Sequence, residues 1–362
     1  MSAQLSKKGE KERWAVVLLN LGGPDSLKSV RPFLFNLFRD RAIIRAPTLV
    51  RLPLAWLIST RRAPVARAIY EEIGGRSPIL KETQAQAQSL ESHITEEVNN
   101  VKIRAFIAMR YWHPRAYETA QAVAAFKPDR LIVLPLYPHY STTTTESSLQ
   151  DWNKAAYSAG LNIPTHDIHI VCCYPEEPDF IIAHAELIVP HLAVSPESNT
   201  RLLFSAHGLP ERIVAAGDPY PHQMRKTCES VIKALRSLRA GSPDPEWKLC
   251  YQSRVGPLAW IGPYTEDEII RASNEKKNIV IAPISFVSEH SETLVELDIE
   301  YKHLADAHGA ASYRRVPALG TNPAFIKALG SLVRRAVKKE GLMCPEDTPG
   351  FPCAADALQA VL

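Results

Sequence analysis

The sequence predicts an α/β fold with two parallel sheets of about four strands each. The chain is 362 residues long, which favours two domains. Short apolar runs of strand length alternate with helical patterns, and this alternation is typical of a parallel sheet that helices cover on both faces. Several runs end in turn signals rich in Gly, Pro and His. We expect these turns at the carboxyl edge of each sheet, where open α/β proteins bind their ligands.

Seven apolar runs are interpreted as buried strands. They are residues 15–21, 103–109, 130–136, 168–173, 201–205, 247–252 and 278–284. Helical patterns lie between most of them, among others at residues 116–126, 221–238 and 291–307. The predicted organisation is a disordered polar tail at 1–13, a first domain at 14–195, a second domain at 196–340, and a linker with a short helix at 341–362. The domain boundary is placed at the polar stretch 195–199.

The composition excludes several classes of protein. Apolar residues make up 46% of the chain and charged residues 22%, which excludes a disordered chain. The net charge is only +3, so nucleic acid is not expected as a partner. No apolar run approaches the length of a membrane-spanning helix. The six cysteines form no CxxC motif and the lysine-rich N-terminus has no apolar signal segment, so we expect a reduced, cytoplasmic setting.

Residues 46–65 combine large apolar side chains with arginines. Two interpretations stay open. A helix of this kind can pack on the core while its arginines extend to water. Alternatively, it forms an apolar lip that touches a membrane surface or an apolar ligand.

His207 follows a predicted strand and precedes the turn Gly208-Leu209-Pro210. At this place an imidazole can face a ligand with a pKa near neutrality. A single histidine at a strand end is more often structural, so other observations have to decide its role. No P-loop, dinucleotide-binding or serine-hydrolase motif offers a competing chemistry.

Four glutamates of a helical pattern fall on one predicted helical face. They are Glu289, Glu292, Glu296 and Glu300. Like charges at this spacing repel, and no lysine stands between them to relieve the repulsion. Together with His207, such a column of carboxylates indicates the handling of a divalent cation or of protons, without a closed, permanent metal site. The alternative is a charged face in contact with solvent.

Aromatic and cationic side chains gather near the predicted strand ends. Flat apolar surfaces beside guanidinium groups suit a planar aromatic ligand that carries carboxylates. Core packing explains each aromatic residue better when it is considered singly. The set includes Tyr70, Tyr111 and Trp260 with Arg61, Arg62, Arg110 and Arg254.

Seven sequence blocks follow one another in an order that one enzyme family shares. They are LLNLGGP at 18–24, IGGRSPI at 73–79, MRYWHP at 109–114, LPLYPHYS at 134–141, SAHGLP at 205–210, YQSRVGP at 251–257 and FVSEHSETL at 286–294. Each block alone is weak evidence. Together they resemble the ferrochelatase family, whose members insert ferrous iron into a porphyrin, and the resemblance spans residues 14 to about 339.

The resemblance implies two Rossmann-like, chelatase-type domains with a porphyrin cleft between them. It implies His207 as the active-site histidine and Glu292 as the acidic residue that faces it, both in catalysis and in metal contact. Glu289, His290 and Glu296 are then the neighbouring path for protons or metal. The positions expected near the porphyrin are Leu21, Arg61, Arg62, Tyr70, Ser77, Arg110, Tyr111, Arg254 and Trp260.

The implied reaction converts protoporphyrin IX and Fe²⁺ into protoheme with release of two protons, the terminal step of heme biosynthesis. Three alternatives remain. The enzyme could act on coproporphyrin III, the protein could be a noncatalytic heme-binding carrier, or it could be a sirohydrochlorin or cobalt chelatase of related fold. The last is disfavoured because those proteins are usually much shorter or have a histidine pair where Glu292 stands. Peripheral contact with the inner face of a membrane is a further expectation, and the oligomeric state stays open.

Fe²⁺ is a substrate in this scheme, and no permanently bound cofactor is expected. Some relatives hold a 2Fe–2S cluster on four cysteines, most of them close together near the C-terminus. Here only Cys344 and Cys353 lie in that region, and Thr142 occupies the position of the distant ligand. Because a cluster needs four thiolates, the sequence does not favour one.

Overall fold

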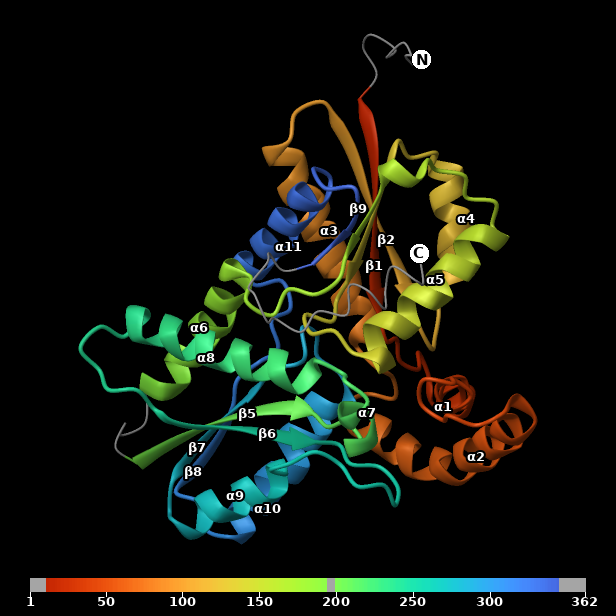
Figure 1. The fold of residues 1–362 in the computed structure, drawn as a ribbon. Coiled ribbons are helices and arrows are strands. Elements are labelled where there is room, and N and C mark those ends of the chain that lie inside the picture. Colours follow the sequence, from red (N-terminus) through yellow and green to blue (C-terminus); the bar gives the residue numbers. More distant parts are fainter. Residues whose placement is uncertain (1–10, 194–198, 345–362) are drawn as a thin grey trace.

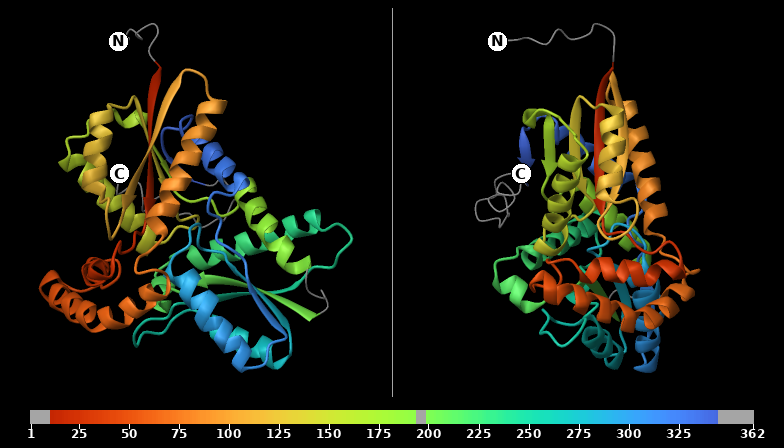
Figure 2. Two further views of the ribbon diagram at one scale, coloured as in Figure 1. Left: turned by 180° about the vertical axis from the view of Figure 1, so that it is seen from behind. Right: turned by 90° about the vertical axis from the view of Figure 1, so that its right-hand side faces the viewer.

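The computed structural model describes residues 11–193 and 199–344 and confirms an α/β fold with two parallel sheets (Figure 1). The strand order is β2-β1-β3-β4-β9 in the first sheet and β6-β5-β7-β8 in the second. Figure 2 shows the same two sheets from behind and from the side, each with its own helices. The carboxyl ends of β1 and β5 lie towards the region where the two halves of the molecule meet (Figure 1).

Nine strands form the two sheets within the described residues. The first sheet contains β1 (Glu12–Asn20), β2 (Val101–Met109), β3 (Arg130–Pro135), β4 (Ile168–Val171) and β9 (Gly341–Met343). The second contains β5 (Thr200–His207), β6 (Glu246–Gln252), β7 (Asn278–Pro283) and β8 (Ser312–Arg315). All seven strands expected from the sequence are present, with ends shifted by a few residues.

The first sheet has five strands instead of the expected four. Strand β9 pairs with β4, so residues 341–343 extend the first sheet and are not part of a linker. Its three residues are too few to form a recognisable apolar run, and β8 has the largely polar sequence SYRR. Residues 1–10 of the expected tail, most of the expected boundary at 195–199, and residues 345–362 of the expected linker and helix lie outside the described residues.

Helices connect the strands and cover both sheets. The α-helices are α1 (Val30–Phe38), α2 (Thr48–Glu72), α3 (Ile79–Glu97), α4 (Ala116–Phe126), α5 (Ser147–Ser158), α6 (Pro178–Ala193), α7 (Glu211–Ala215), α8 (Tyr220–Leu238), α9 (Thr265–Asn274), α10 (Tyr301–Ala307) and α11 (Pro323–Ala336). Two wider π-helices, η2 (Thr142–Glu146) and η5 (Glu292–Glu300), lead into α5 and α10. Short 3₁₀ turns in the described part of the chain include η1 (Leu27–Ser29) and η3 (Thr165–Asp167).

Strand β1 explains why the first sheet is covered on both faces. Val16 and Leu18 point into a core that includes α3 and α11. Val17 and Leu19 point into a second core with α4 and α5. Successive side chains of a strand point to opposite faces of the sheet. A strand in which every residue is apolar therefore needs helices on both faces to bury all its side chains.

The larger core continues from the first sheet into the second. It contains Leu18 of β1 and Phe204 of β5, with Phe180 of α6 and Met224 of α8 between them. Helix α11 follows the last strand of the second sheet but packs against α3 and α6 of the first half. This continuous packing holds the carboxyl edges of the two sheets in a fixed relation.

Over residues 49–65, helix α2 buries small residues and exposes large apolar ones, whereas Tyr70 near its end is buried. Ala55, Ser59 and Ala63, spaced four residues apart, are buried, and α2 packs along α1. The exposed large apolar side chains are Leu49, Val50, Leu52, Leu54, Trp56, Leu57 and Val65. This arrangement is the reverse of an ordinary surface helix. Within the described residues, no helix has both the length and the apolar character needed to cross a bilayer.

Candidate active site

His207 is the last residue of β5, at the carboxyl edge of the second sheet. Its backbone N–H donates to Ser285 Oγ (3.1 Å), and its carbonyl oxygen accepts the Tyr220 hydroxyl of α8 (2.9 Å). The next residue is Gly208, where a Cβ would lie only 3.2 Å from the Trp260 ring. The missing side chain allows Trp260 to approach, with its ring centre 6.4 Å from that of the imidazole. The strand end, a helix and two loops therefore fix His207.

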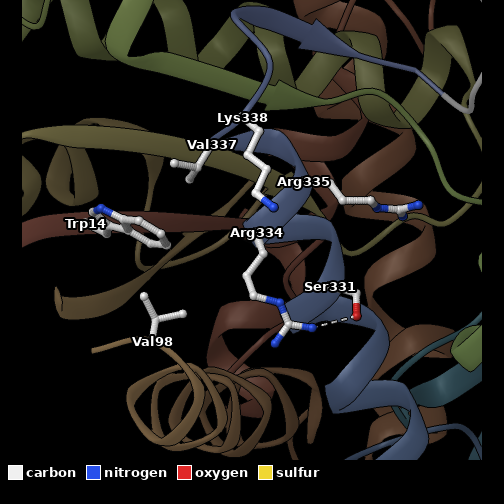
Figure 3. Close-up of a pocket in the computed structure, with 7 residues that line it drawn as sticks. All are labelled: Trp14, Val98, Ser331, Arg334, Arg335, Val337 and Lys338. Atoms are coloured by element: carbon white, nitrogen blue, oxygen red, sulfur yellow. Dashed lines mark hydrogen bonds between the residues drawn. The ribbon is translucent and has the colours of Figure 1, made fainter. Parts of the chain in front are cut away.

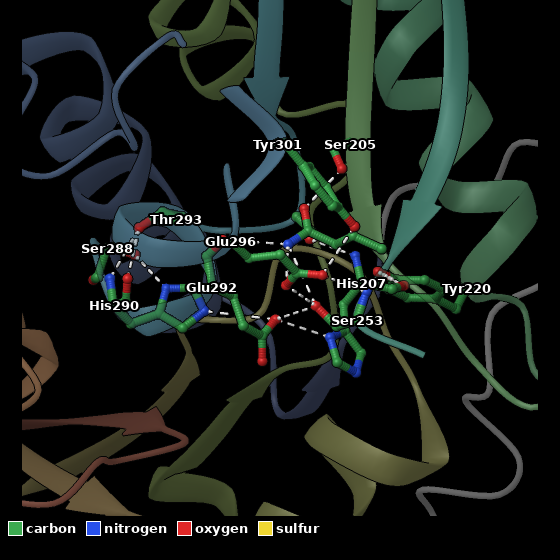
Figure 4. A network of polar contacts seen from close by, with 12 residues as sticks. Ser205, His207, Tyr220, Ser253, Ser288, His290, Glu292, Thr293, Glu296 and Tyr301 are labelled. Carbon is green, nitrogen blue, oxygen red and sulfur yellow. Dashed lines mark hydrogen bonds and ion pairs between the residues drawn. The ribbon is translucent and has the colours of Figure 1, made fainter. Parts of the chain in front are cut away.

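The His207 imidazole contacts the Glu292 carboxylate (Figure 4). Nδ1 of His207 lies 2.9 Å from Oε2 of Glu292. Burial works against a charged imidazole, but the attraction of the Glu292 and Glu296 carboxylates outweighs it and raises the pKa of His207. Burial likewise works against a charged Glu292, but His207 and His290 outweigh it and lower the pKa of Glu292. The His207 side chain remains 38% exposed, so a ligand can reach the pair.

Ser253 joins Glu292 to Glu296. Its hydroxyl lies 3.2 Å from Glu292 Oε2 and 2.5 Å from Glu296 Oε2, and its backbone N–H donates to Glu296 Oε1 (2.9 Å). Ser253 adopts a positive φ of 64°, a conformation that costs energy for a residue with a Cβ. This turn after β6 aims both the N–H and the hydroxyl at the two carboxylates (Figure 4).

Glu296 has the environment of a proton acceptor. Its oxygens also accept the Gln252 side-chain amide (3.0 Å) and the Tyr301 hydroxyl (2.9 Å). Burial and the nearby negative charge of Glu292 raise the pKa of Glu296, and the hydrogen bonds only partly offset this. The two carboxylates therefore differ: Glu292 favours the charged form, and Glu296 holds a proton more readily.

The π-helix η5 places these glutamates differently from the predicted α-helical face. The Tyr301 N–H bonds to the Glu296 carbonyl five residues earlier, which widens the turn. Glu292 and Glu296 both reach the His207 site, whereas Glu300 is exposed. Thus two of the four glutamates form the cluster, and Glu300 faces solvent.

Glu289 precedes η5 and turns away from this cluster. Its Oε1 accepts Arg315 Nη1 (2.8 Å) and the Ala318 backbone N–H (2.9 Å). Burial raises the pKa of Glu289, but Arg315 outweighs burial and brings it below the usual range. The cation that relieves the expected repulsion thus comes from β8, which the spacing of lysines within the helix could not reveal.

His290 lies at the edge of the cluster. Its Nε2 is 3.8 Å from Glu292 Oε2, and its Nδ1 is 3.2 Å from the Ser288 carbonyl oxygen. The side chain is largely buried and stacks edge-on with Phe286. His290 therefore has direct access to Glu292, as a neighbouring position in a path requires.

Trp260 and Tyr70, two of the expected porphyrin positions, lie beside this cluster, and Leu21 packs against the apolar residues around Tyr70. Trp260 packs against His207, as described above. Tyr70 of α2 is buried; burial, reinforced by the Glu292 charge, raises its pKa to about 12, although a hydrogen bond with Ser291 works against this rise. Leu21 follows β1 and is held by its own N–H to Asn20 Oδ1 (2.8 Å). Helix α2 thus approaches the second-sheet site from the first half of the molecule, and the turn after β1 packs against α2.

Ser77 packs against the turn after β1. Its N–H donates to the Pro24 carbonyl oxygen (2.8 Å), and a Cβ at Gly23 would lie 2.5 Å from its side chain. Gly23 is therefore required for this close approach.

Arg110 and Tyr111 form a closed polar cluster at the end of β2. Arg110 Nη2 lies 2.7 Å from Asp40 Oδ2, and its Nη1 lies 3.4 Å from Asp151 Oδ2. The Tyr111 hydroxyl donates to the same Asp40 oxygen (2.8 Å), and its side chain is fully buried. Both residues already have protein partners, so the structure does not offer them as open ligand contacts.

The other expected arginines differ in their surroundings. Arg61 and Arg62 are exposed on α2, with no ion pair to a described residue. Arg254 lies over the Tyr264 ring at 3.9 Å and donates to Glu266 (2.8 Å). Arg61 and Arg62 are therefore the more available cations.

Sequence reasoning did not single out Ser253, Gln252 or Tyr301. The block YQSRVGP contains the first two, but a serine and a glutamine after a strand carry no distinctive spacing. Tyr301 lies five residues after Glu296, a separation that only a π-helical turn makes adjacent. The turn geometry, not the residue types, reveals them.

A separate hollow of about 480 Å³ lies at the other end of the first sheet (Figure 3). Trp14 near the start of β1, Val98 and the end of α11 line it. It is remote from His207, because Trp14 stands at the amino end of its strand. Among the described residues, no group of three or more His, Cys, Asp or Glu side chains is arranged to hold a metal ion.

The family model for ferrochelatase matches residues 13–337, which is most of the chain. The chain belongs to the ferrochelatase family. It is 52% identical to ferrochelatase of Caulobacter vibrioides over 356 residues, covering 96% of this chain and 99% of that protein. It is 47% identical to ferrochelatase of Pelagibacter ubique over 350 residues, covering 94% and 98%.

A solved structure, SirB from Bacillus subtilis with Fe³⁺, shares the fold. Its TM-score is 0.51 at 13% identity, covering 90% of this chain and 96% of SirB. This likeness concerns the chelatase fold alone. Membership of the ferrochelatase family, in contrast, makes this chain a metal-inserting enzyme of heme biosynthesis, with ferrous iron and a porphyrin as its substrates.

Proposed function

We propose that the chain inserts Fe²⁺ into protoporphyrin IX with His207 as the acceptor of the pyrrole protons and Glu292 as its partner. The 2.9 Å contact between His207 Nδ1 and Glu292 Oε2 carries this proposal. When the Nδ1–H group donates to the carboxylate, Nε2 keeps its lone pair. An imidazole in this tautomer can take a proton from the ring, and Glu292 then stabilises the imidazolium.

The released protons leave through Glu292, Ser253 and Glu296. The Ser253 hydroxyl lies within hydrogen-bond distance of both carboxylates, so it can pass a proton between them. The raised pKa of Glu296 makes it the next acceptor along this route. Tyr301 continues the chain of hydrogen bonds towards α10.

The same groups contact the incoming iron. Ferrous iron accepts imidazole and carboxylate ligands, and Oε2 of Glu292 lies 2.9 Å from His207 Nδ1 and 3.8 Å from His290 Nε2. An open arrangement of this kind suits a metal ion that must leave for the porphyrin nitrogens. Glu289 is omitted from the path because Arg315 neutralises it.

The porphyrin occupies a cleft between the carboxyl edges of the two sheets. Trp260, Tyr70 and Leu21 supply flat or apolar surface, and Ser77 lies on the same side as Leu21. Arg61 and Arg62 are the cations for the propionate groups, because their guanidinium groups are exposed and have no described partner. Arg110 and Tyr111 act by holding the end of β2, and Arg254 by its place in the loop that carries Trp260.

Anaerobic incubation of purified protein with Fe²⁺ and each porphyrin tests the proposed substrate. We expect the Soret band to shift with protoporphyrin IX and much more slowly with coproporphyrin III. Faster turnover of coproporphyrin III would overturn the substrate assignment. No insertion with either porphyrin, together with tight retention of added heme, would indicate a noncatalytic heme-binding carrier instead.

The absence of a permanent cofactor remains a prediction. Cys172 and Cys344 directly follow the paired ends of β4 and β9, and both pack in the same core as Cys173. Cys353 lies outside the described residues. Iron and sulfide analysis of the purified protein decides the matter: two irons and two sulfides per chain contradict the prediction.

The exposed side of α2 is proposed to contact a membrane from the cytoplasmic side. Seven large apolar side chains share this surface with Arg61 and Arg62. Apolar side chains beside cations fit the boundary between the headgroups and acyl chains of an anionic lipid surface. An apolar porphyrin can then pass between the lipid and the protein.

A further inference from the structure

The side chain of Gln86 in α3 is fully buried, and its hydrogen bonds within the described part of the chain all reach residues more than 200 positions away. Its Nε2 group donates to the carbonyl oxygens of Val287 (2.7 Å) and Gly320 (3.0 Å). Its Oε1 accepts the Ser288 hydroxyl (3.2 Å). Because two carbonyl oxygens can only accept, the orientation of the amide is fixed. One side chain from the first half of the molecule thus holds two loops of the second.

The loop that Gln86 holds leads directly to the candidate active site. The Ser288 carbonyl oxygen lies 3.2 Å from His290 Nδ1, and His290 Nε2 lies 3.8 Å from Glu292 Oε2. The Thr293 hydroxyl accepts the His290 N–H (3.0 Å) and thereby starts η5. The position of Val287 and Ser288 therefore sets where η5 begins and where Glu292 points.

The same helix also holds the edge of the first sheet. Thr83, three residues before Gln86, accepts the Asn20 side-chain amide at the end of β1 (2.9 Å). Asn20 in turn accepts the Leu21 N–H. One face of α3 therefore connects the turn after β1 with the segment before η5, and both connections are buried.

We propose that Gln86 is a positioning residue that aligns Glu292 and His207 with the porphyrin-facing edge of the first sheet. It touches no reacting group and acts through Val287, Ser288 and His290. The inference rests on the proposed role of Glu292, because a misplaced Glu292 matters only if that carboxylate takes part in insertion. The proposal predicts that loss of the Gln86 hydrogen bonds lowers turnover and leaves porphyrin binding unchanged.

Gln86→Met tests this proposal, because methionine keeps the length of the side chain and removes all three hydrogen bonds. Gln84→Met is the matched control: Gln84 lies on the same helix but is exposed. We measure kcat and KM for anaerobic Fe²⁺ insertion, porphyrin affinity by fluorescence quenching, and the melting temperature. For Gln86→Met we expect kcat to fall at least about tenfold, with porphyrin affinity changed by less than about twofold. For Gln84→Met we expect wild-type values.

Gln86→Met also leaves the Gly320 carbonyl oxygen and the Ser288 hydroxyl without this partner, and these losses lower its stability. The Val287 carbonyl oxygen keeps the Gly320 N–H (3.0 Å). A melting temperature that falls while kcat per folded protein stays at the wild-type value would show a purely structural role and overturn the proposal. If Gln86→Met does not fold, Ser288→Ala removes one of the three bonds and must lower kcat in the same direction with porphyrin affinity unchanged. An unchanged kcat in Ser288→Ala would then overturn the proposal. Full activity of Glu292→Gln would contradict the proposed role of Glu292 itself, and this result does not depend on the activity of Gln86→Met.

Discussion

At the scale of single residues, the cluster around His207 separates two carboxylates by their surroundings. Glu292 pairs with His207 and stays charged, whereas Glu296 has no cationic partner of this kind among the described residues, is close to the charge of Glu292 and has a raised pKa. Pairs of acids with opposed pKa shifts are typical of sites that move protons. His207 and Glu292 could be predicted from the sequence through two motif blocks. The Ser253 bridge could not, since it depends on a positive φ that no residue type announces.

The glutamate series tests this division of roles. We expect Glu292→Gln to slow insertion by about a hundredfold or more, because it removes the partner of the proton acceptor. Glu296→Gln should slow it less, by roughly tenfold, because it removes only the next proton acceptor along the route. Glu300→Gln serves as the exposed control and should leave the rate unchanged. The measurement is the insertion rate of each of the three variants as a function of Fe²⁺ concentration. Equal losses of rate at all three sites would refute the order Glu292, Glu296, Glu300.

At the scale of elements, π-helix η5 and helix α2 both depart from the sequence-based expectation. The glutamate spacing predicted one face of an α-helix, but the wider turn of η5 and the partnership of Glu289 with Arg315 leave only Glu292 and Glu296 at the site. For α2, the pattern left two interpretations open. The helix does pack on α1, but it does so through small residues, which leaves the large apolar side chains in water.

Removing two side chains from the exposed face of α2 should weaken binding to anionic lipid vesicles. Leu49 and Trp56 are 90% and 54% exposed, and burial of such a side chain is worth roughly 1.5–3 kcal/mol. We expect Leu49→Ser with Trp56→Ser to reduce vesicle co-sedimentation by at least about tenfold. Tyr157→Ser is the control, because Tyr157 is 89% exposed on α5, away from α2. Equal loss in the control, or no loss in the double variant, argues against a lipid contact on α2.

At the scale of the whole molecule, seven of the nine described strands and the parallel α/β architecture were predictable from apolar runs alone. The fifth strand of the first sheet was not, because β9 has three residues and gains its place by pairing with β4 after α11 has crossed back. The core shared by Leu18 and Phe204 makes the two halves one packed body. Such long-range packing follows from the fold and leaves no local signal in the sequence.

The shared core also contains two buried histidines that should make stability depend on pH. Burial lowers the pKa of His139, with a further contribution from His184, and burial lowers the pKa of His184; both values fall to about 3 from an ordinary 6.5. Protonation therefore favours the unfolded chain. This stability is fully present above pH 6.5 and is lost as the pH falls towards 3, at up to about 1.4 kcal/mol per pH unit for each histidine.

Urea unfolding at neutral and at mildly acidic pH measures this effect. His184→Gln should reduce the acid-induced shift of the unfolding midpoint, because glutamine does not titrate. His166→Gln is the control, since its side chain is 64% exposed. If His184→Gln keeps the full pH dependence of the wild type, buried histidines are not its source.

The most direct test of the central claim is the anaerobic rate of Fe²⁺ insertion by His207→Ala, measured beside its porphyrin affinity and its melting temperature. The account predicts a folded protein that binds porphyrin with nearly wild-type affinity and inserts iron at least about a hundredfold more slowly. A His207→Ala variant that keeps more than about a tenth of the wild-type rate would contradict it.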